Sequence, residues 1–89
     1  MIGLNLTPHP VMVMYYVYIL RHKETRELYY GYTNNLKQRL KQHNRKSPRE
    51  LIYYEAYKKE LDARRREKRL KNYAQALTAI KSRLRESLK

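Results

Sequence analysis

The stretch YYVYIL at residues 15–20 decides the fold. It is β-branched and aromatic without a breaker, so we expect a buried strand. The following residues 21–27 are polar or charged and contain no apolar side chain, which predicts a hairpin loop. LYYGY at residues 28–32 then predicts the returning strand, and Gly31 near its end indicates a close backbone approach or a bulge.

Further along the chain the pattern changes from strand to helix. Thr33, Asn34 and Asn35 are residue types that cap helices, and they introduce a helix predicted at residues 34–43. A polar, proline-stopped loop is expected at 44–48, and a third strand at 51–57.

The remainder, from Lys59 to the end, has helical periodicity, with an apolar stripe and a break near Asn72-Tyr73. Two helices that fold back on the sheet are expected there, although one continuous helix fits the same pattern. The predicted fold is α+β, with a small three-stranded mixed or antiparallel sheet flanked by helices. Its order is β-β-α-β-α-α, and residues 14–89 form one domain.

Charge defines the class of partner. The 89 residues include 21 Lys and Arg but only 8 Asp and Glu, a net charge of +13. Such a field attracts polyanions, and nucleic acid is the commonest, although an anionic membrane surface or an inert basic surface gives the same composition. The absence of cysteine excludes disulfides and cysteine-based zinc sites and fits a reducing compartment, so we expect a cytoplasmic protein.

No segment has the ~18 apolar residues of a membrane span, so no membrane insertion is expected. Residues 1–13 are uncharged and carry two prolines, which indicates a flexible leader rather than a signal peptide. Met12 or Met14 is an alternative natural start.

Two polar residues share the apolar face of the predicted first helix. At about 100° per residue, Arg39 and His43 fall in one sector with Leu36 and Leu40. The non-functional interpretation is that Arg39 extends to solvent from the edge of the apolar face, and that His43 is a hydrogen-bonded histidine at the boundary of the core. A pair of this kind facing a tyrosine-rich sheet favours a phosphate site.

Glu67 occupies an apolar stripe between Ala63 and Leu70 in the next helical segment, with basic residues on both sides. It is either a salt-bridge partner of those residues, which contributes little, or a ligand for a hard cation such as Mg²⁺. Spacing alone leaves both interpretations open. Tyrosines complete the pattern: Tyr18 and Tyr29 lie on neighbouring strands and can reach one cleft.

These residues resemble the GIY-YIG nuclease family over about residues 15–73. The likeness lies in YVY at 16–18, YYG at 29–31 and the segment GYTNNL at 31–36, and in RRREKRL at 64–70. It is closest to small single-domain bacterial members, which resemble the N-terminal nuclease domain of the excision-repair endonuclease. Tyr16 replaces the glycine of the first motif, and Tyr30 replaces the isoleucine of the second.

The resemblance implies a role for each matching residue. Tyr18 and Tyr29 would line the cleft, and one of them would orient or activate the attacking water. Arg39 would bind the scissile phosphate, and His43 would assist proton transfer or position a tyrosine. Glu67 would hold a single Mg²⁺ or Mn²⁺ ion. A nearby arginine and metal would lower the tyrosine pKa from about 10, which makes a tyrosinate available as a base.

The sequence therefore predicts a metal-dependent endonuclease acting on DNA, structured or branched substrates included, with a role in repair or recombination. No small-molecule cofactor is expected, and the oligomeric state is open. The alternatives are a catalytically idle nucleic-acid-binding module and a basic ribosome-associated or scaffold protein. The expected phosphate-contacting residues are Lys37, Lys41, Arg64, Arg65, Lys68 and Arg69.

Overall fold

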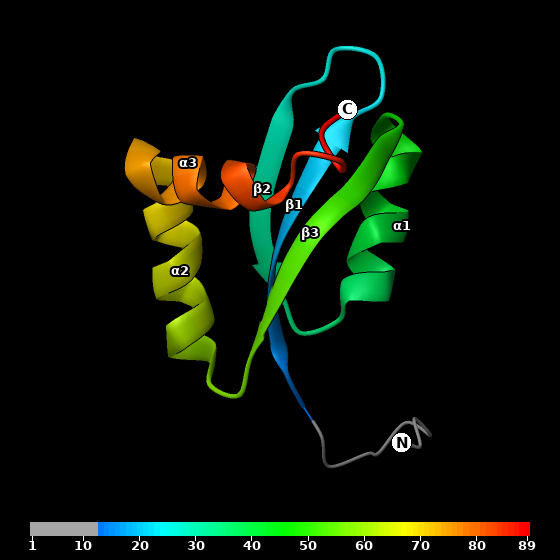
Figure 1. Ribbon diagram of the computed structural model, residues 1–89. Helices are drawn as coiled ribbons and strands as arrows, with labels where there is room; N and C mark the ends of the chain where they lie inside the picture. Colours follow the sequence, from blue (N-terminus) through cyan, green and yellow to red (C-terminus); the bar gives the residue numbers. More distant parts are fainter. Residues whose placement is uncertain (1–12) are drawn as a thin grey trace, which may run out of the picture.

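A computed structural model describes residues 13–89 of the chain, with three strands and three helices in the predicted order (Figure 1). The elements are β1 (Tyr15–His22), β2 (Leu28–Thr33), α1 (Leu36–Lys46), β3 (Arg49–Tyr57), α2 (Glu60–Asn72) and α3 (Ala74–Arg83). The α+β class and the order β-β-α-β-α-α are confirmed.

The sheet has the strand order β2-β1-β3, and both pairings of the central strand are antiparallel. The pairing of β1 with β3 shifts register at one place: Ile19 faces Tyr53, but Leu20 faces Leu51. Ile52 is the extra residue of this irregularity. Because side chains alternate with a period of two, one inserted residue reverses the phase of the side chains before it relative to those after it, so that Arg49 and Leu51 face the α1 side.

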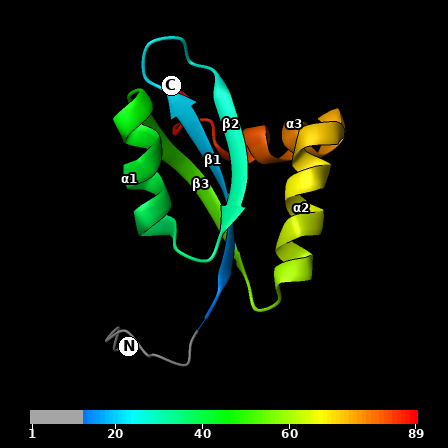
Figure 2. The same ribbon diagram turned by 180° about the vertical axis from the view of Figure 1, so that it is seen from behind.

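Helices cover the two faces of the sheet unequally. Helices α2 and α3 lie on one face and α1 on the other, as the two opposite views show (Figure 1, Figure 2). The core lies on the α2 and α3 side, where Val17 and Ile19 of β1 pack against the buried residues Ala63, Leu70 and Ile80. Helix α1 has no fully buried residue, although Tyr18 and Leu20 of β1 are buried beneath it.

The first strand is longer than expected, and the predicted loop at 21–27 is wrong at its start. Arg21 belongs to β1 and is only 6% exposed. Its guanidinium donates to Glu50 Oε1 at 2.8 Å, to the Leu88 carbonyl at 2.7 Å and to the Lys89 carbonyl at 3.2 Å. A buried arginine with this many acceptors extends the strand despite its charge, because its guanidinium N–H groups find partners.

The first helix was predicted at 34–43, but it begins two residues later, at Leu36, and ends later, at Lys46. Asn35 is its N-cap and accepts from the Gln38 backbone N–H at 3.1 Å. The loop predicted at 44–48 is wrong in its first half, since α1 continues to Lys46. Asn44 explains the extension: its amide donates to the Leu40 carbonyl, and its Oδ1 accepts from the Arg49 backbone N–H, both at 3.1 Å.

Two further boundaries differ at the C-terminal side. Strand β3 begins at Arg49 rather than at residue 51, because Glu50 pairs with Arg21 across the sheet. The break near Asn72-Tyr73 is confirmed: Tyr73 separates α2 from α3. Helix does not persist to the end, since α3 stops at Arg83 and turns follow, with their final carbonyls accepting from Arg21.

Residues 1–12 of the expected leader lie outside the described residues. Among residues 13–89, none of the helices has the length and apolar character needed to cross a membrane.

Two leucines of α2 provide a matched test of the core. Leu70 is 2% exposed and belongs to the core cluster, whereas Leu61 is 53% exposed. Leu70→Ala should lower the free energy of unfolding by about 2–5 kcal/mol, because it removes buried methyl groups and leaves a cavity. Leu61→Ala should change it by less than about 1 kcal/mol. Urea unfolding of both variants measures the difference, and equal losses would contradict the assigned packing of α2.

Candidate active site

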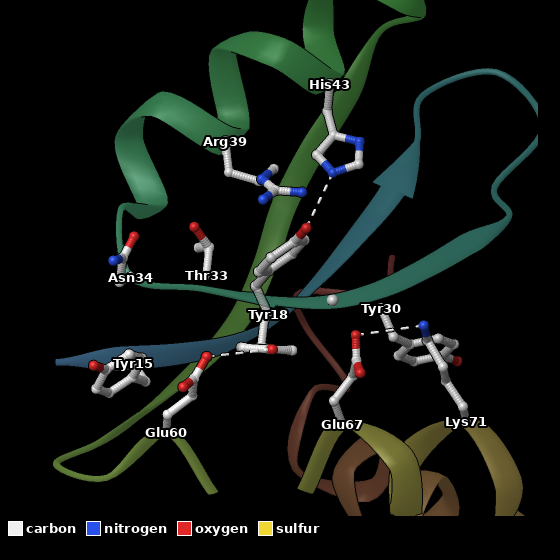
Figure 3. Close-up of a pocket in the computed structure, with 12 residues that line it drawn as sticks. Tyr15, Tyr18, Tyr30, Thr33, Asn34, Arg39, His43, Glu60, Glu67 and Lys71 are labelled. Atoms are coloured by element: carbon white, nitrogen blue, oxygen red, sulfur yellow. Dashed lines mark hydrogen bonds and ion pairs between the residues drawn. The ribbon is translucent and has the colours of Figure 1, made fainter. Parts of the chain in front are cut away.

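A cavity of about 550 Å³ opens where β1, β2, α1 and α2 approach one another. In the close-up, Tyr18 lies between Arg39 and His43 on α1 and Glu67 and Lys71 on α2 (Figure 3). The residues that line it are Tyr15, Tyr18, Tyr30, Gly31, Tyr32, Thr33, Asn34, Arg39, His43, Glu60, Glu67 and Lys71. Four of the five residues predicted as catalytic or metal-binding therefore share one space.

Gly31 makes room for Tyr18. The two residues are directly opposite in the antiparallel pair of β1 and β2. A Cβ atom on Gly31 would lie 2.6 Å from the Tyr18 Cζ, closer than such contacts occur in proteins. The expected close approach at this glycine is therefore confirmed, and the approaching group is the phenol ring. Any larger residue at this position would displace the Tyr18 hydroxyl.

Tyr18 is 2% exposed, yet its hydroxyl is in hydrogen-bond contact with His43 Nε2 at 3.1 Å. The rings meet edge to face, with centroids 5.8 Å apart. Burial raises the pKa of Tyr18 above 10.0, and the positive charge of Arg39 opposes this rise without cancelling it. The lowered tyrosine pKa expected from the sequence is therefore not found in the protein alone, because desolvation outweighs the arginine.

His43 is held from both sides of its ring. While Nε2 contacts Tyr18, Nδ1 lies 2.8 Å from Nη1 of Arg49 at the start of β3. Partial burial lowers the pKa of His43, and the positive charges of Arg49, Arg39 and Lys46 lower it further. The imidazole is thus neutral at physiological pH, since its ordinary pKa is already about 6.5.

Arg39 is exposed on the inner face of α1, one turn before His43, and both side chains line the cavity. The predicted sharing of one helix face is confirmed. An exposed guanidinium at a cavity wall offers several N–H donors in a fixed fork, a geometry that matches phosphate oxygens.

Glu67 is partly buried on α2, and its carboxylate lies 3.4 Å from the ammonium of Lys71, one turn away. Glu60, two turns before Glu67, lines the same cavity and accepts from the Tyr32 hydroxyl at 3.4 Å. Within residues 13–89 no three His, Cys, Asp or Glu side chains converge as a ready metal cage. Carboxylate oxygens beside an open cavity nevertheless fit Mg²⁺, which binds through one or two carboxylates plus substrate phosphate.

Tyr29 is not among the residues that line the cavity, which corrects the expectation that both tyrosines do. In the β1–β2 register Tyr29 faces Leu20, two residues beyond the Tyr18–Gly31 pair. Its ring instead lies under the guanidinium of Arg49, 3.8 Å from the ring centroid, and its hydroxyl donates to Glu27 at 2.9 Å.

Five of the six predicted phosphate-contacting residues fall into two groups. Arg64, Arg65 and Lys68 line a second hollow beside the cavity that shares Glu67 and Lys71 with it. Lys37 and Lys41 line a shallow hollow on α1. Arg69 lies apart from both, with its guanidinium 5.2 Å from the ring centroid of Tyr73.

Three charged residues were not predicted from the sequence: Glu60 and Lys71, which line the cavity, and Arg49, which lies behind it in contact with His43. A signal existed for two of them, because Glu60 and Lys71 are spaced seven and four residues from Glu67 and thus share its helix face. Arg49 had no such signal, since its position depends on the register irregularity in β3.

Comparison with known proteins agrees with this geometry. The profile of the GIY-YIG catalytic domain matches residues 14–81. A UPF0213 protein of Clostridium perfringens (strain 13 / Type A) is 40% identical over 63 residues, which span 61% of this chain and 67% of that protein. No solved structure matches the chain significantly. With the match covering most of its length, including the strands and helices that form the cavity, the chain belongs to the GIY-YIG family of nuclease catalytic domains.

Proposed function

We propose that this protein is an endonuclease that hydrolyses phosphodiester bonds in DNA with the help of one divalent metal ion. The observation that carries the proposal is the convergence of Tyr18, Arg39, His43 and Glu67 on one cavity from β1, α1 and α2. A hydroxyl, a guanidinium and a carboxylate around an open space supply a water-orienting group, an anion-binding group and a metal ligand.

Each of these residues has a separate role in the proposed reaction. Arg39 binds the scissile phosphate and stabilises the negative charge that develops on its oxygens. Tyr18 orients the water whose oxygen attacks phosphorus, and His43 fixes the position of the Tyr18 hydroxyl through their hydrogen bond. Tyr18 rather than Tyr29 takes this role, because only Tyr18 lines the cavity.

Glu67 would hold a Mg²⁺ or Mn²⁺ ion, with Glu60 as the second carboxylate at the same wall. When bound there, such an ion would supply positive charge to polarise the phosphoryl oxygens and offset the charge of the leaving oxygen. Lys71 fits this arrangement, since its ammonium lies 3.4 Å from the Glu67 carboxylate and holds it beside the cavity. DNA is the proposed substrate, structured or branched forms included, with repair or recombination as the setting.

A nucleic-acid-binding module without catalytic activity is the second candidate. The observation that favours it is the contact between Glu67 and Lys71, because an ion pair at 3.4 Å satisfies the carboxylate without any metal. The basic residues around the cavity would serve either function.

Glu67→Gln separates the two candidates. A neutral amide is a poor ligand for a hard cation, so the variant should remain folded, bind DNA as well as the parent or slightly better, and lose metal-dependent cleavage. Plasmid nicking across a Mg²⁺ or Mn²⁺ titration measures cutting, and a gel shift without metal measures binding.

Glu86→Gln is the matched control, since Glu86 forms an exposed pair with Lys89 away from the cavity. It should cut as the parent does, because exposed ion pairs contribute only about 0–1 kcal/mol. Parental nicking by Glu67→Gln would rule out Glu67 as the metal ligand. A parent that nicks no DNA tested would favour the binding module.

Arg39→Ala should leave the fold intact and lower the cleavage rate by about 10²-fold or more, the scale of losing one preorganised charge stabiliser. Arg45→Ala removes the same charge from α1 at a residue that does not line the cavity, and should retain most activity. Thermal melts and nicking rates of both variants provide the comparison. A destabilised Arg39→Ala protein with parental activity would make Arg39 structural.

DNA binding should weaken steeply with salt. Residues 58–89 carry 12 Lys and Arg against 4 Asp and Glu, so +8 of the net +13 lies there. Neutralising roughly five phosphates gives a log–log slope of about −4 to −5. Fluorescence anisotropy at several salt concentrations measures it, and either a flat dependence or a strong preference for one duplex sequence would contradict phosphate-dominated binding.

A further inference from the structure

Three side chains form a continuous chain that ends at the cavity. The Arg49 guanidinium lies against the Nδ1 side of His43 at 2.8 Å, and the opposite ring nitrogen lies 3.1 Å from the Tyr18 hydroxyl. Arg49 itself does not line the cavity that holds Tyr18. Apart from the direct effect of its charge on Tyr18, Arg49 therefore reaches the Tyr18 hydroxyl through the imidazole.

The chemistry of arginine determines the direction of both hydrogen bonds. A guanidinium has five N–H donors and no acceptor, and it stays protonated in proteins. Nδ1 of His43 must accept from Arg49, so it carries no proton. A neutral imidazole with an unprotonated Nδ1 carries its single proton on Nε2, and this N–H therefore points at the oxygen of Tyr18.

We propose that Arg49 is a positioning residue that locks His43 in the Nε2–H tautomer and thereby makes His43 a hydrogen-bond donor to Tyr18. This inference rests on the proposed nuclease function only for its effect on cleavage. It specifies which of the two roles the family resemblance allowed: His43 orients and stabilises the phenol oxygen, and it does not remove the phenol proton.

The surroundings of Arg49 hold it in place on three sides. Its guanidinium stacks on Tyr29 at 3.8 Å, its backbone N–H donates to Asn44, and the register irregularity at Ile52 turns its side chain to the α1 face. Within the described residues its buried Nε has no hydrogen-bond partner. Burying an N–H donor without a partner destabilises the fold. The hydrogen bonding of the Arg49 side chain by itself therefore does not explain why the residue is placed here.

The arrangement gives Tyr29 an indirect role. Its ring attracts the guanidinium through a cation–π interaction and keeps it against His43. Tyr29 thus acts on Tyr18 through Arg49 and His43, although it lies outside the cavity.

The consequence concerns the proton of Tyr18. Because the phenol oxygen accepts from His43, its own proton is directed elsewhere, and within residues 13–89 the Tyr18 hydroxyl has no hydrogen bond besides the one with His43. The cavity side is where a water molecule or a phosphate oxygen can receive it. The charged groups facing the imidazole are Arg49 from β3 and Arg39 and Lys46 from α1, all cationic, and they lower the pKa of His43 after the larger effect of burial.

Imidazole ¹H–¹⁵N correlation spectra test the tautomer directly, because protonated and unprotonated ring nitrogens resonate in separate regions. The full-length protein at a pH where His43 is neutral should show Nε2 protonated and Nδ1 unprotonated. Arg49→Glu replaces the donor with an acceptor and should reverse the two assignments. Arg49→Lys, which still offers only donors, should retain the parental pattern.

Lys46→Glu is the matched control for Arg49→Glu. It makes the same change of charge near His43 at a residue without a hydrogen bond to the ring, so the parental tautomer should persist. In nicking assays Arg49→Glu should cut roughly 10- to 100-fold more slowly, the range found for partners that fix the tautomer of metal-bound histidines. Arg49→Lys should recover part of this loss.

The proposal fails if Nδ1 of the wild-type protein is protonated, or if folded Arg49→Glu keeps the parental spectrum. If Arg49→Glu does not fold, the spectrum of the wild-type protein is sufficient to test the tautomer assignment. A parent that cuts no DNA would overturn the proposed function but leave the tautomer assignment standing, so the two failures are distinguishable.

Discussion

Strand β1 is hydrogen-bonded along both edges and covered on both faces, so residues 17–20 are no more than 2% exposed. Alternation sends Val17 and Ile19 into the apolar core, and Tyr18 with Leu20 to the face of α1. The hydroxyl of a buried tyrosine needs a hydrogen-bond partner, and for Tyr18 this partner is His43. The buried polar atom of the central strand thereby links the sheet to α1 at the wall of the cavity.

The two faces of the sheet have different physical characters. On one face α2 and α3 pack through Ala63, Leu70 and Ile80, whereas α1 on the other has no fully buried residue. Polar contacts through His43 and Asn44 join α1 to Arg49 of β3. The carboxylate of Glu67 therefore belongs to the half with the apolar core, and the exposed Arg39 to the half held by polar contacts, and both line the cavity.

Much of the candidate site is a local property of the sequence. Arg39 and His43 share a helix face by their spacing, and Glu67 interrupts an apolar stripe. Both patterns survive in the structure because helix periodicity fixes which residues are neighbours before any tertiary contact forms. The expectation failed for Tyr29, because the same strand face extends beyond the cavity and the sequence does not show where the cavity ends.

By itself the sequence determined the types and order of the elements, the break at Tyr73 and the residues of each helix face, because hydrophobic period and capping chemistry are local. Only the tertiary structure decided the ends of β1, α1 and β3, which depend on distant partners such as Arg21 with Leu88 and Asn44 with Arg49. It also decided that Arg49 meets His43. One extra residue at Ile52 reverses the alternation of side chains along β3. Whether a residue is extra depends on the register with the partner strand, which the sequence of β3 does not contain.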